Sequence, residues 1–468
     1  MEPNDVSKPF EDLPLDILGQ TERINRLYTQ ITLCFPIPDG PPSSRTEIID
    51  NLNRGLPQLS FSLPWVAGSV VQDDGVFKIR PSRAAISLVV RELDDDTTVS
   101  TWDELQKADF PFRMLDEDAI APCKTMVDPG GERPVLMVQA SFVKGGVLIT
   151  FNAQHGSMDM TGQAQIMTLF AKACRGEQFT EDEVNIGSMQ RTARIPLPDD
   201  DTMNDSDSQN SRPQETAENV KPDKRIHTPP FSVPPKILIW AYFEFSSASL
   251  SNLKTLANQH LTGEATFVST DDVLTAFVWQ SITRARQPRL DSPRPIPTTT
   301  LSRNVDVRRH FNLPPTYPGL VTTATSHLSD VDDLLNQRSL GAIASELRAA
   351  LDPDALRNNA QSQAAAIATK RGPAAAQRSV MASNDPSLDV RLSSWAKEKL
   401  YSLDFGPGLG QPQAVRRPRF GDGAREGLVY LLPKARNGAV VVGICLREED
   451  MERMKVDGEV LRWSRWIG

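Results

Sequence analysis

The sequence predicts a protein of mixed α/β or α+β class that is built from two domains of similar size. Its 468 residues exceed the usual extent of a single hydrophobic core. Segments with strand character and segments with helix character alternate in both halves of the chain. A strongly polar stretch separates the halves, so we expect one domain at residues 1–195 and a second at residues 236–468.

The polar stretch covers residues 196–235 and reads PLPDDDTMNDSDSQNSRPQETAENVKPDKRIHTPPFSVPP. It is rich in Asp, Ser, Asn and Pro and has almost no apolar residues, so it cannot bury enough surface to pack. We expect it to be a disordered crossover linker. An expanded surface loop within one domain is the alternative that the sequence leaves open.

The first half contains a β-hairpin. VLMVQASF at Val135–Phe142 and VLITFNAQ at Val147–Gln154 flank the turn VKGG, in which glycines supply positive φ angles. A helix should follow, because apolar residues then recur at helical spacing until Gly176, a natural stop. These apolar residues are Ile166, Leu169, Phe170, Ala173 and Cys174.

The second half repeats this mixture of elements. Aromatic and β-branched residues predict a strand over Lys236–Ser246, and a Ser269/Thr270 cap predicts the start of a helix. LVYLLP at Leu428–Pro433 and AVVVGICL at Ala439–Leu446 flank KARNG and predict a second hairpin. The last element should be one closing helix over residues 448–463.

The composition excludes several classes of function. A net charge of −9 argues against nucleic acid as a partner. The acidic N-terminus does not resemble a signal peptide, and no apolar run approaches the roughly 20 residues of a membrane helix. We therefore expect a cytoplasmic protein without membrane partners. The four cysteines form no CxxC pair and fit a reducing compartment; they are Cys34, Cys123, Cys174 and Cys445.

The stretch FNAQHGSMDMTG at residues 151–162 places His155 between the second strand of the first hairpin and the helix. A neutral imidazole with a pKa near 6.5 can take a proton from a hydroxyl group. If the turn is helical, Asp159 shares a face with His155 and could orient the ring, or it could anchor the loop through an arginine. A metal site is the weaker interpretation, because HEXXH and further ligands at suitable spacing are absent. A single histidine before a helix is more often structural, so the motif alone decides little.

A second motif, LDFGPGLGQPQAVRRP, lies at Leu403–Pro418, about 250 residues further along the chain. In isolation it predicts only a tight turn that leaves a strand.

The two motifs together, HxxxD and DFGxG, resemble those of the BAHD acyltransferases, and most closely the fungal branch that includes trichothecene 3-O-acetyltransferase. Further segments resemble the recurring segments of the family in the same order, so the resemblance covers nearly the whole chain outside the linker. These segments are LPLDILGQ (13–20), LPWVAGSV (63–70), FPFRMLDEDAIAP (110–122), STDDVLTAFVWQSI (269–282) and SRNVDVRRHFNLPPTYPG (302–319).

The resemblance implies a two-domain fold like that of chloramphenicol acetyltransferase, with a channel between the domains. Acyl-CoA, as a co-substrate, would enter from one side, and a hydroxylated small molecule would enter from the other. His155 would be the catalytic general base in a ternary complex, without a metal or a permanently bound cofactor. The segment near residues 404–428 would pack with the first domain.

The resemblance also implies residues that support the site. Asp159 would pair with an arginine, for which Arg308 in VDVRRH is the candidate. Asp404, Gly406 and Gly408 would hold the DFG turn. Plant members of the family commonly read HHxxxDG and DFGWG. In this chain Gln154 stands in place of the first histidine, Met160 follows the aspartate and Pro407 replaces the tryptophan. The tryptophan's loss puts in doubt any role of that position as a hydrogen-bond donor to the substrate.

Residues that bind CoA are less well defined by the sequence. Arg416 and Arg417 follow the DFG turn on predicted loops, where a guanidinium could bind a phosphate. The predicted helix start at Ser269 and Thr270 is a second candidate for binding an anion. A solvated basic loop and a plain helix cap explain the same residues equally well.

These observations predict an acyl-CoA-dependent O-acyltransferase, with acetyl as the expected donor and a fungal terpenoid or polyketide as the expected acceptor. We expect a monomer. One alternative is a condensation-type enzyme that uses an acyl carrier protein, although the doubled histidine of that class is missing. The other is a non-catalytic descendant that binds a small molecule, against which the intact His155, Asp159 and Asp404 argue.

Overall fold

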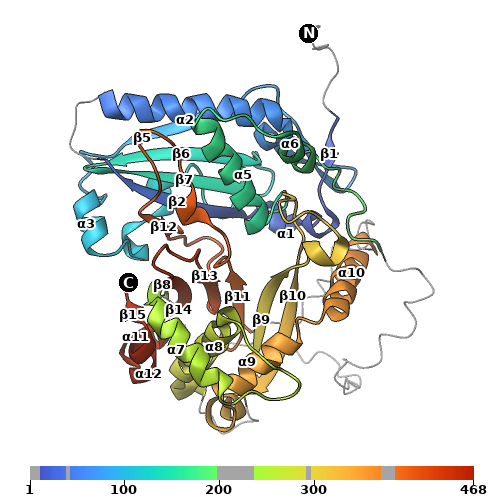
Figure 1. Ribbon diagram of the computed structural model, residues 1–468, viewed down its shortest axis with the longest axis vertical. Coiled ribbons are helices and arrows are strands. Elements are labelled where there is room, and N and C mark those ends of the chain that lie inside the picture. The colour runs from blue at the N-terminus through green and yellow to red at the C-terminus, as the bar shows by residue number, and fades with distance from the viewer. Residues whose placement is uncertain (1–10, 38–42, 198–236, 291–296, 370–384) are drawn as a thin grey trace, which may run out of the picture.

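Two mixed sheets form the core of the protein, each with helices packed against it (Figure 1). The computed structural model describes residues 11–37, 43–197, 237–290, 297–369 and 385–468. The predicted linker at residues 196–235 therefore lies outside the described residues, apart from its first two positions. None of the described helices is long and apolar enough to cross a membrane.

The first sheet has five strands in the order β12-β2-β7-β6-β5. Its hairpin of β6 and β7 is antiparallel, as predicted, and pairs Phe142 with Val147. Inward-facing apolar residues of the sheet join those of helices α2 and α5 in one core cluster. The bounds of these elements are β2 Tyr28–Pro36, β5 Leu88–Glu92, β6 Leu136–Val143, β7 Gly146–Gln154, β12 Ala414–Arg416, α2 Ser43–Ser62 and α5 Met160–Cys174.

One strand of this sheet comes from the second half of the chain. β12 pairs antiparallel with β2, so that Ala414 lies opposite Cys34 and Arg416 lies opposite Thr32. Because β12 follows the DFG turn, the turn is carried to the first sheet and lies beside α5. The two halves therefore share a sheet.

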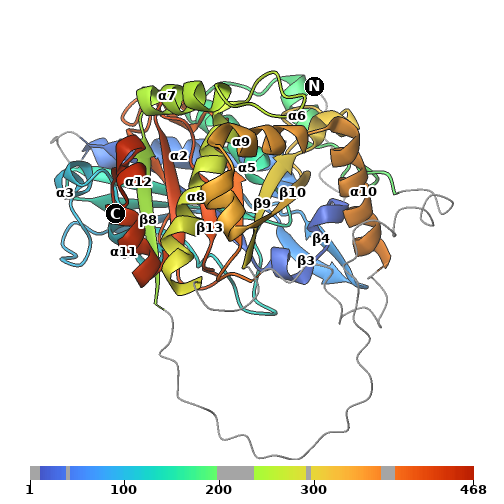
Figure 2. The same ribbon diagram turned by 90° about the horizontal axis from the view of Figure 1, so that it is seen from below.

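The second sheet has seven strands in the order β10-β9-β11-β13-β14-β8-β15. The predicted strand near residue 240 is β8, and the predicted second hairpin is the antiparallel pair of β13 and β14. Figure 2 shows α8 against these strands, with α7 and α9 alongside. The bounds are β8 Leu238–Phe245, β9 Thr298–Asp306, β10 Thr322–Asp330, β11 Val390–Ser394, β13 Leu428–Leu431, β14 Val440–Arg447, β15 Arg465–Trp466, α7 Ser247–Asn258, α8 Thr270–Leu290 and α9 Leu340–Ala349.

The predicted single closing helix is instead two helices, α11 at Glu448–Val456 and α12 at Gly458–Trp463. Asp457 separates them because its side chain accepts hydrogen bonds from the backbone of Glu459 and Val460 and so caps a new helix. The chain then returns as β15, which pairs with β8.

Further helices and strands complete the fold. A three-stranded sheet in the order β1-β4-β3 lies next to the first sheet, and α10 packs against β10. These elements are β1 Leu13–Pro14, β3 Ser69–Asp73, β4 Val76–Arg80, α1 Glu22–Asn25, α3 Trp102–Lys107, α4 Glu117–Ile120, α6 Glu181–Gly187 and α10 Pro353–Thr369.

Candidate active site

His155 lies in the turn that follows β7, with its ring half-buried. Its backbone N–H donates to the Leu27 carbonyl at 2.8 Å. The ring Nδ1 is 3.4 Å from the Met158 carbonyl oxygen and 3.3 Å from Thr29 Oγ1. A carbonyl oxygen only accepts hydrogen bonds, so this contact favours a proton on Nδ1 and leaves the lone pair on Nε2. Among the described residues, none forms a hydrogen bond with Nε2.

Burial lowers the pKa of His155 below its ordinary value. The nearby Asp159 carboxylate and the Met158 carbonyl oppose this shift, whereas the positive charge of Arg417 adds to it. The imidazole is therefore neutral near pH 7, which is the state that a general base requires.

Gln154 fixes the shape of the turn. Its side-chain oxygen accepts from the Ser157 N–H at 2.7 Å, and its side-chain nitrogen donates to the Asn25 backbone carbonyl at 3.0 Å. Gly156 is required beside it, because a Cβ there would lie 2.3 Å from Asn25 Oδ1. The residue that replaces the first histidine of the plant pattern thus supports the turn from within.

Asp159 is the N-cap of α5, and residues 155–159 form a turn rather than the helical turn that would place His155 and Asp159 on one face. The carboxylate accepts five hydrogen bonds, none of them from His155. Of the two roles that the sequence left open for Asp159, these contacts favour the anchor. The donors are Gly162 N, Val321 N, Thr322 Oγ1 and both Nη atoms of Arg308, at 2.8–3.1 Å.

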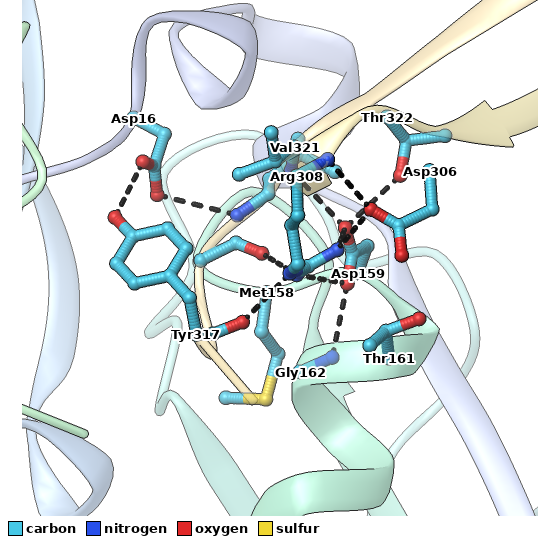
Figure 3. Close-up of polar contacts among 12 residues, drawn as sticks. Asp16, Met158, Asp159, Thr161, Gly162, Asp306, Arg308, Tyr317, Val321 and Thr322 are labelled. Carbon is cyan, nitrogen blue, oxygen red and sulfur yellow. Dashed lines mark hydrogen bonds and ion pairs between the residues drawn. The ribbon is translucent and has the colours of Figure 1, made fainter. Parts of the chain in front are cut away.

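Arg308 is the partner of Asp159, and the pair joins the two halves of the chain (Figure 3). Its Nη1 also donates to Asp306 Oδ1 at 3.0 Å, its Nη2 to the Gly319 carbonyl at 2.6 Å, and its Nε to the Tyr317 carbonyl at 2.9 Å. Burial by itself would lower the pKa of Arg308, but the carboxylates of Asp159 and Asp306 raise it above its ordinary value. The guanidinium is therefore permanently charged and fully occupied.

A second buried cluster, not identified from the sequence, supports the same turn. Asp16 accepts from the Tyr317 hydroxyl at 2.6 Å (Figure 3). It also accepts from the Leu320 N–H at 3.2 Å and pairs with Arg191 at 3.4 Å. Arg191 in turn donates to the Ser157 carbonyl. Burial raises the pKa of Asp16 despite these partners. Asp16 and Tyr317 both lie in segments that resemble the family, and this was the signal that could have identified them.

The DFG turn is held by its own aspartate and glycines. Asp404 Oδ1 accepts from the Gly406 N–H at 2.8 Å, and Gly406 and Gly408 have φ angles of +82° and +87°, which favour glycine. Phe405 is buried against the rings of Phe35, Phe151 and Phe170 at centroid distances of 5.6, 6.4 and 5.9 Å. This packing fixes the turn against the first sheet.

The structure corrects the predicted position of Arg416. It lies in β12 rather than on a loop, and it is buried. Its guanidinium donates to the carbonyls of Phe110, Asp109 and Val415 at 2.9–3.1 Å. These contacts occupy the groups that a CoA phosphate would need. The neighbouring Arg417 is also buried rather than on a solvated loop.

Ser269 and Thr270 stand at the start of α8, where the sequence predicted a helix. The Ser269 hydroxyl accepts from the Asp272 N–H, and Asp272 in turn accepts from the Ser269 N–H at 2.8 Å. This reciprocal capping accounts for Ser269 without a ligand. A phosphate site at this helix start remains a prediction.

Within the described residues, no group of three or more His, Cys, Asp or Glu side chains is placed to hold a metal ion. The four cysteines are free thiols.

A half-buried imidazole with a free Nε2, presented by a strand-to-helix turn where two mixed α/β halves meet, is the arrangement of an acyltransferase of the BAHD class. A model of the "trichothecene 3-O-acetyltransferase-like N-terminal domain" matches residues 27–174. The chain belongs to this trichothecene 3-O-acetyltransferase-like family of BAHD acyltransferases.

Similarity to individual members extends over the whole chain. An O-acetyltransferase of a Cryptosporiopsis species is 42% identical over 97% of both chains. A trichothecene 3-O-acetyltransferase of Fusarium sporotrichioides is 41% identical, with 98% of this chain and 97% of the relative covered. A crystal structure of the Fusarium graminearum enzyme with coenzyme A and deoxynivalenol has a TM-score of 0.86 at 36% identity, and covers 98% of this chain and 100% of that chain.

Proposed function

We propose that the protein is an acyl-CoA-dependent O-acyltransferase that transfers an acetyl group to a hydroxyl of a fungal secondary metabolite such as a terpenoid or a polyketide. The observation that carries the proposal is the His155 imidazole, which is neutral and has a free Nε2. The similarity to O-acetyltransferases over nearly the full chain supports the donor and the class of acceptor.

The reaction needs only His155 as a reacting group of the protein. Nε2 takes the proton of the acceptor hydroxyl while the hydroxyl oxygen attacks the thioester carbonyl carbon. The carbonyl electron pair moves to oxygen and forms a tetrahedral intermediate. When this pair returns, the carbon–sulfur bond breaks, and the CoA thiolate receives the proton from His155. The products are an ester and free CoA, and no covalent acyl-enzyme forms.

The remaining groups hold His155 in place. Asp159, Arg308 and Asp16 fix the ends of its turn, and Asp404 with its glycines fixes the DFG turn that packs on the same sheet. Acyl-CoA is consumed in the reaction and is therefore a co-substrate rather than a resident cofactor. The channel through which both substrates reach His155 is part of this proposal.

The relatives support the proposed ligands. The Fusarium graminearum structure was obtained with coenzyme A and deoxynivalenol, and the acceptor of this chain would likewise be a hydroxylated small molecule. We further propose a monomer that works in the cytoplasm, where its four free thiols remain reduced.

The carrier-protein alternative is not favoured. The family relatives are named as O-acetyltransferases, and Gln154 occupies the place of the first histidine. The Gln154 side chain bonds to Ser157 and Asn25 and so holds the turn rather than supplying a second imidazole. A non-catalytic role is equally disfavoured by the neutral imidazole with its free Nε2.

The test follows the release of free thiol from acetyl-CoA with a panel of hydroxylated terpenoids and polyketides that includes deoxynivalenol. At least one acceptor should release CoA, and His155→Ala should slow this release by about 10²–10⁴-fold. His260→Ala is the matched control, because His260 is exposed and should be replaceable without loss. Turnover that survives in a folded His155→Ala variant would defeat the mechanism. Consumption of an acyl carrier protein substrate without CoA release would defeat the proposed donor.

A further inference from the structure

Arg417, the residue that follows β12, is held rigidly inside the protein. It is only 3% exposed. The hydroxyl of Tyr242, in β8, accepts from the Arg417 N–H at 2.9 Å and donates to the Arg417 carbonyl at 2.9 Å. The backbone N–H and carbonyl of Arg417 are therefore both fixed to β8 of the second sheet.

Aromatic rings enclose the Arg417 side chain. The guanidinium carbon lies 4.3 Å from the ring centroid of Phe420, 4.6 Å from that of Tyr430 and 5.8 Å from that of Trp395. Trp240 packs against two of these rings, at 4.8 Å from Phe420 and 5.8 Å from Tyr430. The rings fix the orientation of the guanidinium and shield it from bulk water.

The guanidinium lacks the partners that a buried charge requires. Its Nε is buried without a hydrogen-bond partner, and among the described residues the side chain forms neither a hydrogen bond nor an ion pair. The neighbouring Arg416 and the anchoring Arg308 differ, since carbonyls and carboxylates satisfy their donors. Ring faces offset only part of the cost of burying an unpaired cation. An anionic group of a bound molecule would complete the site.

The position of Arg417 connects it to the reacting centre. β12 pairs with β2, and Thr29 of β2 contacts the His155 ring at 3.3 Å. Burial is the main cause of the lowered pKa of His155, and the charge of Arg417 lowers it further. Burial raises the pKa of Glu117, and the same guanidinium partly opposes that shift. Arg417 follows directly on the strand that pairs with β2, the strand whose Thr29 contacts the His155 ring.

We propose that the Arg417 guanidinium stabilises the negative charge that develops on the thioester oxygen during acyl transfer at His155. The inference rests on the proposed function. In the attack, the carbonyl electron pair moves to this oxygen, and it returns when the carbon–sulfur bond breaks and CoA leaves. The acceptor hydroxyl oxygen would lie about 3 Å from Nε2 and about 3 Å from the thioester carbonyl carbon. The thioester oxygen would therefore lie roughly 5–6 Å from Nε2. A fixed donor in a shielded site stabilises such a charge more strongly than water does.

A CoA phosphate is the other anion that could pair with Arg417, and kinetics separate the two. A charge that appears only in the transition state affects kcat, whereas a phosphate contact present throughout affects KM for acetyl-CoA. Arg417→Met should therefore lower kcat by about 10²–10³-fold with the KM for acetyl-CoA changed by less than about threefold. Arg417→Lys, which keeps the charge, should recover part of kcat.

The control for this experiment is Arg419→Met. Arg419 is two residues further on, but its side chain is 49% exposed and pairs with Asp116 at the surface. This variant should keep the wild-type kcat. Circular dichroism and thermal melting check each variant, and if Arg417→Met does not fold, Arg417→Gln replaces it as the neutral variant.

A second readout does not depend on an acceptor. Two charged groups act on His155, the Asp159 carboxylate from its own turn and Arg417 from the segment after β12. Removing the positive charge favours the imidazolium, so the His155 pKa, followed by NMR and assigned with His155→Ala, should rise in Arg417→Met. It should return toward the wild-type value in Arg417→Lys. A merely structural role would leave the titration unchanged in every folded variant.

The outcomes are distinct. If the wild-type protein releases no CoA with any acceptor, the proposed function fails, while the histidine titration still reports whether the Arg417 charge acts at the site. If the wild type is active and folded Arg417→Met or Arg417→Gln retains its kcat, the inference is overturned. It is also overturned if the only kinetic change is a higher KM for acetyl-CoA, which would assign Arg417 to a CoA phosphate.

Discussion

At the scale of single residues, the structure separates His155, the proposed base, from the groups that hold its turn. Among the described residues, the His155 ring has two long polar contacts, at 3.3 and 3.4 Å to Nδ1, and Nε2 remains free to exchange a proton. Asp159, four residues later, accepts five hydrogen bonds and has no capacity left for the ring. The Asp159–Arg308 ion pair therefore fixes the turn that carries His155 without a hydrogen bond to the ring, which would raise the pKa of the imidazole.

The lowered pKa of His155 predicts the pH dependence of activity. The base works only when neutral, so kcat/KM should rise with pH through the His155 pKa and then level off. Because burial lowers this pKa, the midpoint of the acidic limb should lie below the ordinary value of about 6.5. Rates of CoA release between pH 4.5 and pH 8, roughly centred on that value, measure the limb. A midpoint above 6.5 would contradict the assigned environment.

The Asp159–Arg308 pair predicts a loss of stability. Asp159→Asn leaves Arg308 buried without its main counter-charge and should lower the free energy of unfolding by about 3–5 kcal/mol. Asp354→Asn is the matched control, because the Asp354–Arg357 pair is exposed and should contribute less than about 1 kcal/mol. Urea unfolding measures both. Unchanged stability together with lost activity would instead assign Asp159 a direct role at the ring.

At the scale of elements, the sequence predicted what local patterns determine. Both hairpins and the start of α8 were predicted correctly, because alternation, turn glycines and a capping serine are local signals. The division at Asp457 was missed, since an aspartate within a helical pattern does not reveal that it caps a second helix. The pairing of Arg416 with Thr32 joins residues 384 positions apart, the difference of their numbers, and no local pattern contains it.

The site was predictable to a similar extent. The two motifs identified His155, Asp159 and Asp404, and the resemblance named Arg308 as the partner of Asp159. Asp16 and Arg191 were missed because an aspartate in a short apolar segment carries no sign of its partners. The burial of Arg417 among aromatic rings was also missed. Two arginines after a turn have the same sequence pattern whether their side chains are solvated or buried.

The first turn of α5 fits tightly against the second half of the chain. A Cβ on Gly162 would lie 2.0 Å from the Pro318 carbonyl oxygen. Gly162→Ala should therefore destabilise the protein by about 1–3 kcal/mol and lower activity, because the strain acts next to the N-cap Asp159. Thermal melting and CoA release measure these effects.

The control for this prediction is Gly458→Ala. Gly458 lies in the first turn of α12, where an added Cβ meets no atom within 4 Å. Alanine should be neutral there or stabilise the protein by up to about 1 kcal/mol. Equal effects at the two glycines would show that backbone freedom, rather than the contact with Pro318, explains the loss.

At the scale of the whole molecule, the two halves share one core. The apolar cluster of the first sheet contains Phe35 and Phe151 from the first half together with Phe405, Val415 and Trp240 from the second. β12 also covers the edge of β2. The two halves are therefore separate in sequence, but their side chains pack into a common core.

This shared core predicts the behaviour of the isolated first half. A chain of residues 1–197 would lose β12 and Phe405, which exposes a strand edge and a buried apolar surface. It should aggregate when produced alone and become soluble when residues 237–468 are produced with it. Size-exclusion chromatography and circular dichroism provide the measurement. A monomeric 1–197 fragment with a cooperative melting transition would show that the first half folds independently.

The shared strand also constrains how such enzymes can be recombined. A chimaera that joins the first half of one family member to the second half of another would place a foreign DFG turn and a foreign β12 into the sheet that presents His155. A chimaera that takes residues 403–417 from the same parent as residues 11–197 keeps the pairing of β12 with β2 and the packing of Phe405 on Phe35. Swapping the rest of the second half would then exchange residues between relatives without rebuilding the turn that carries His155.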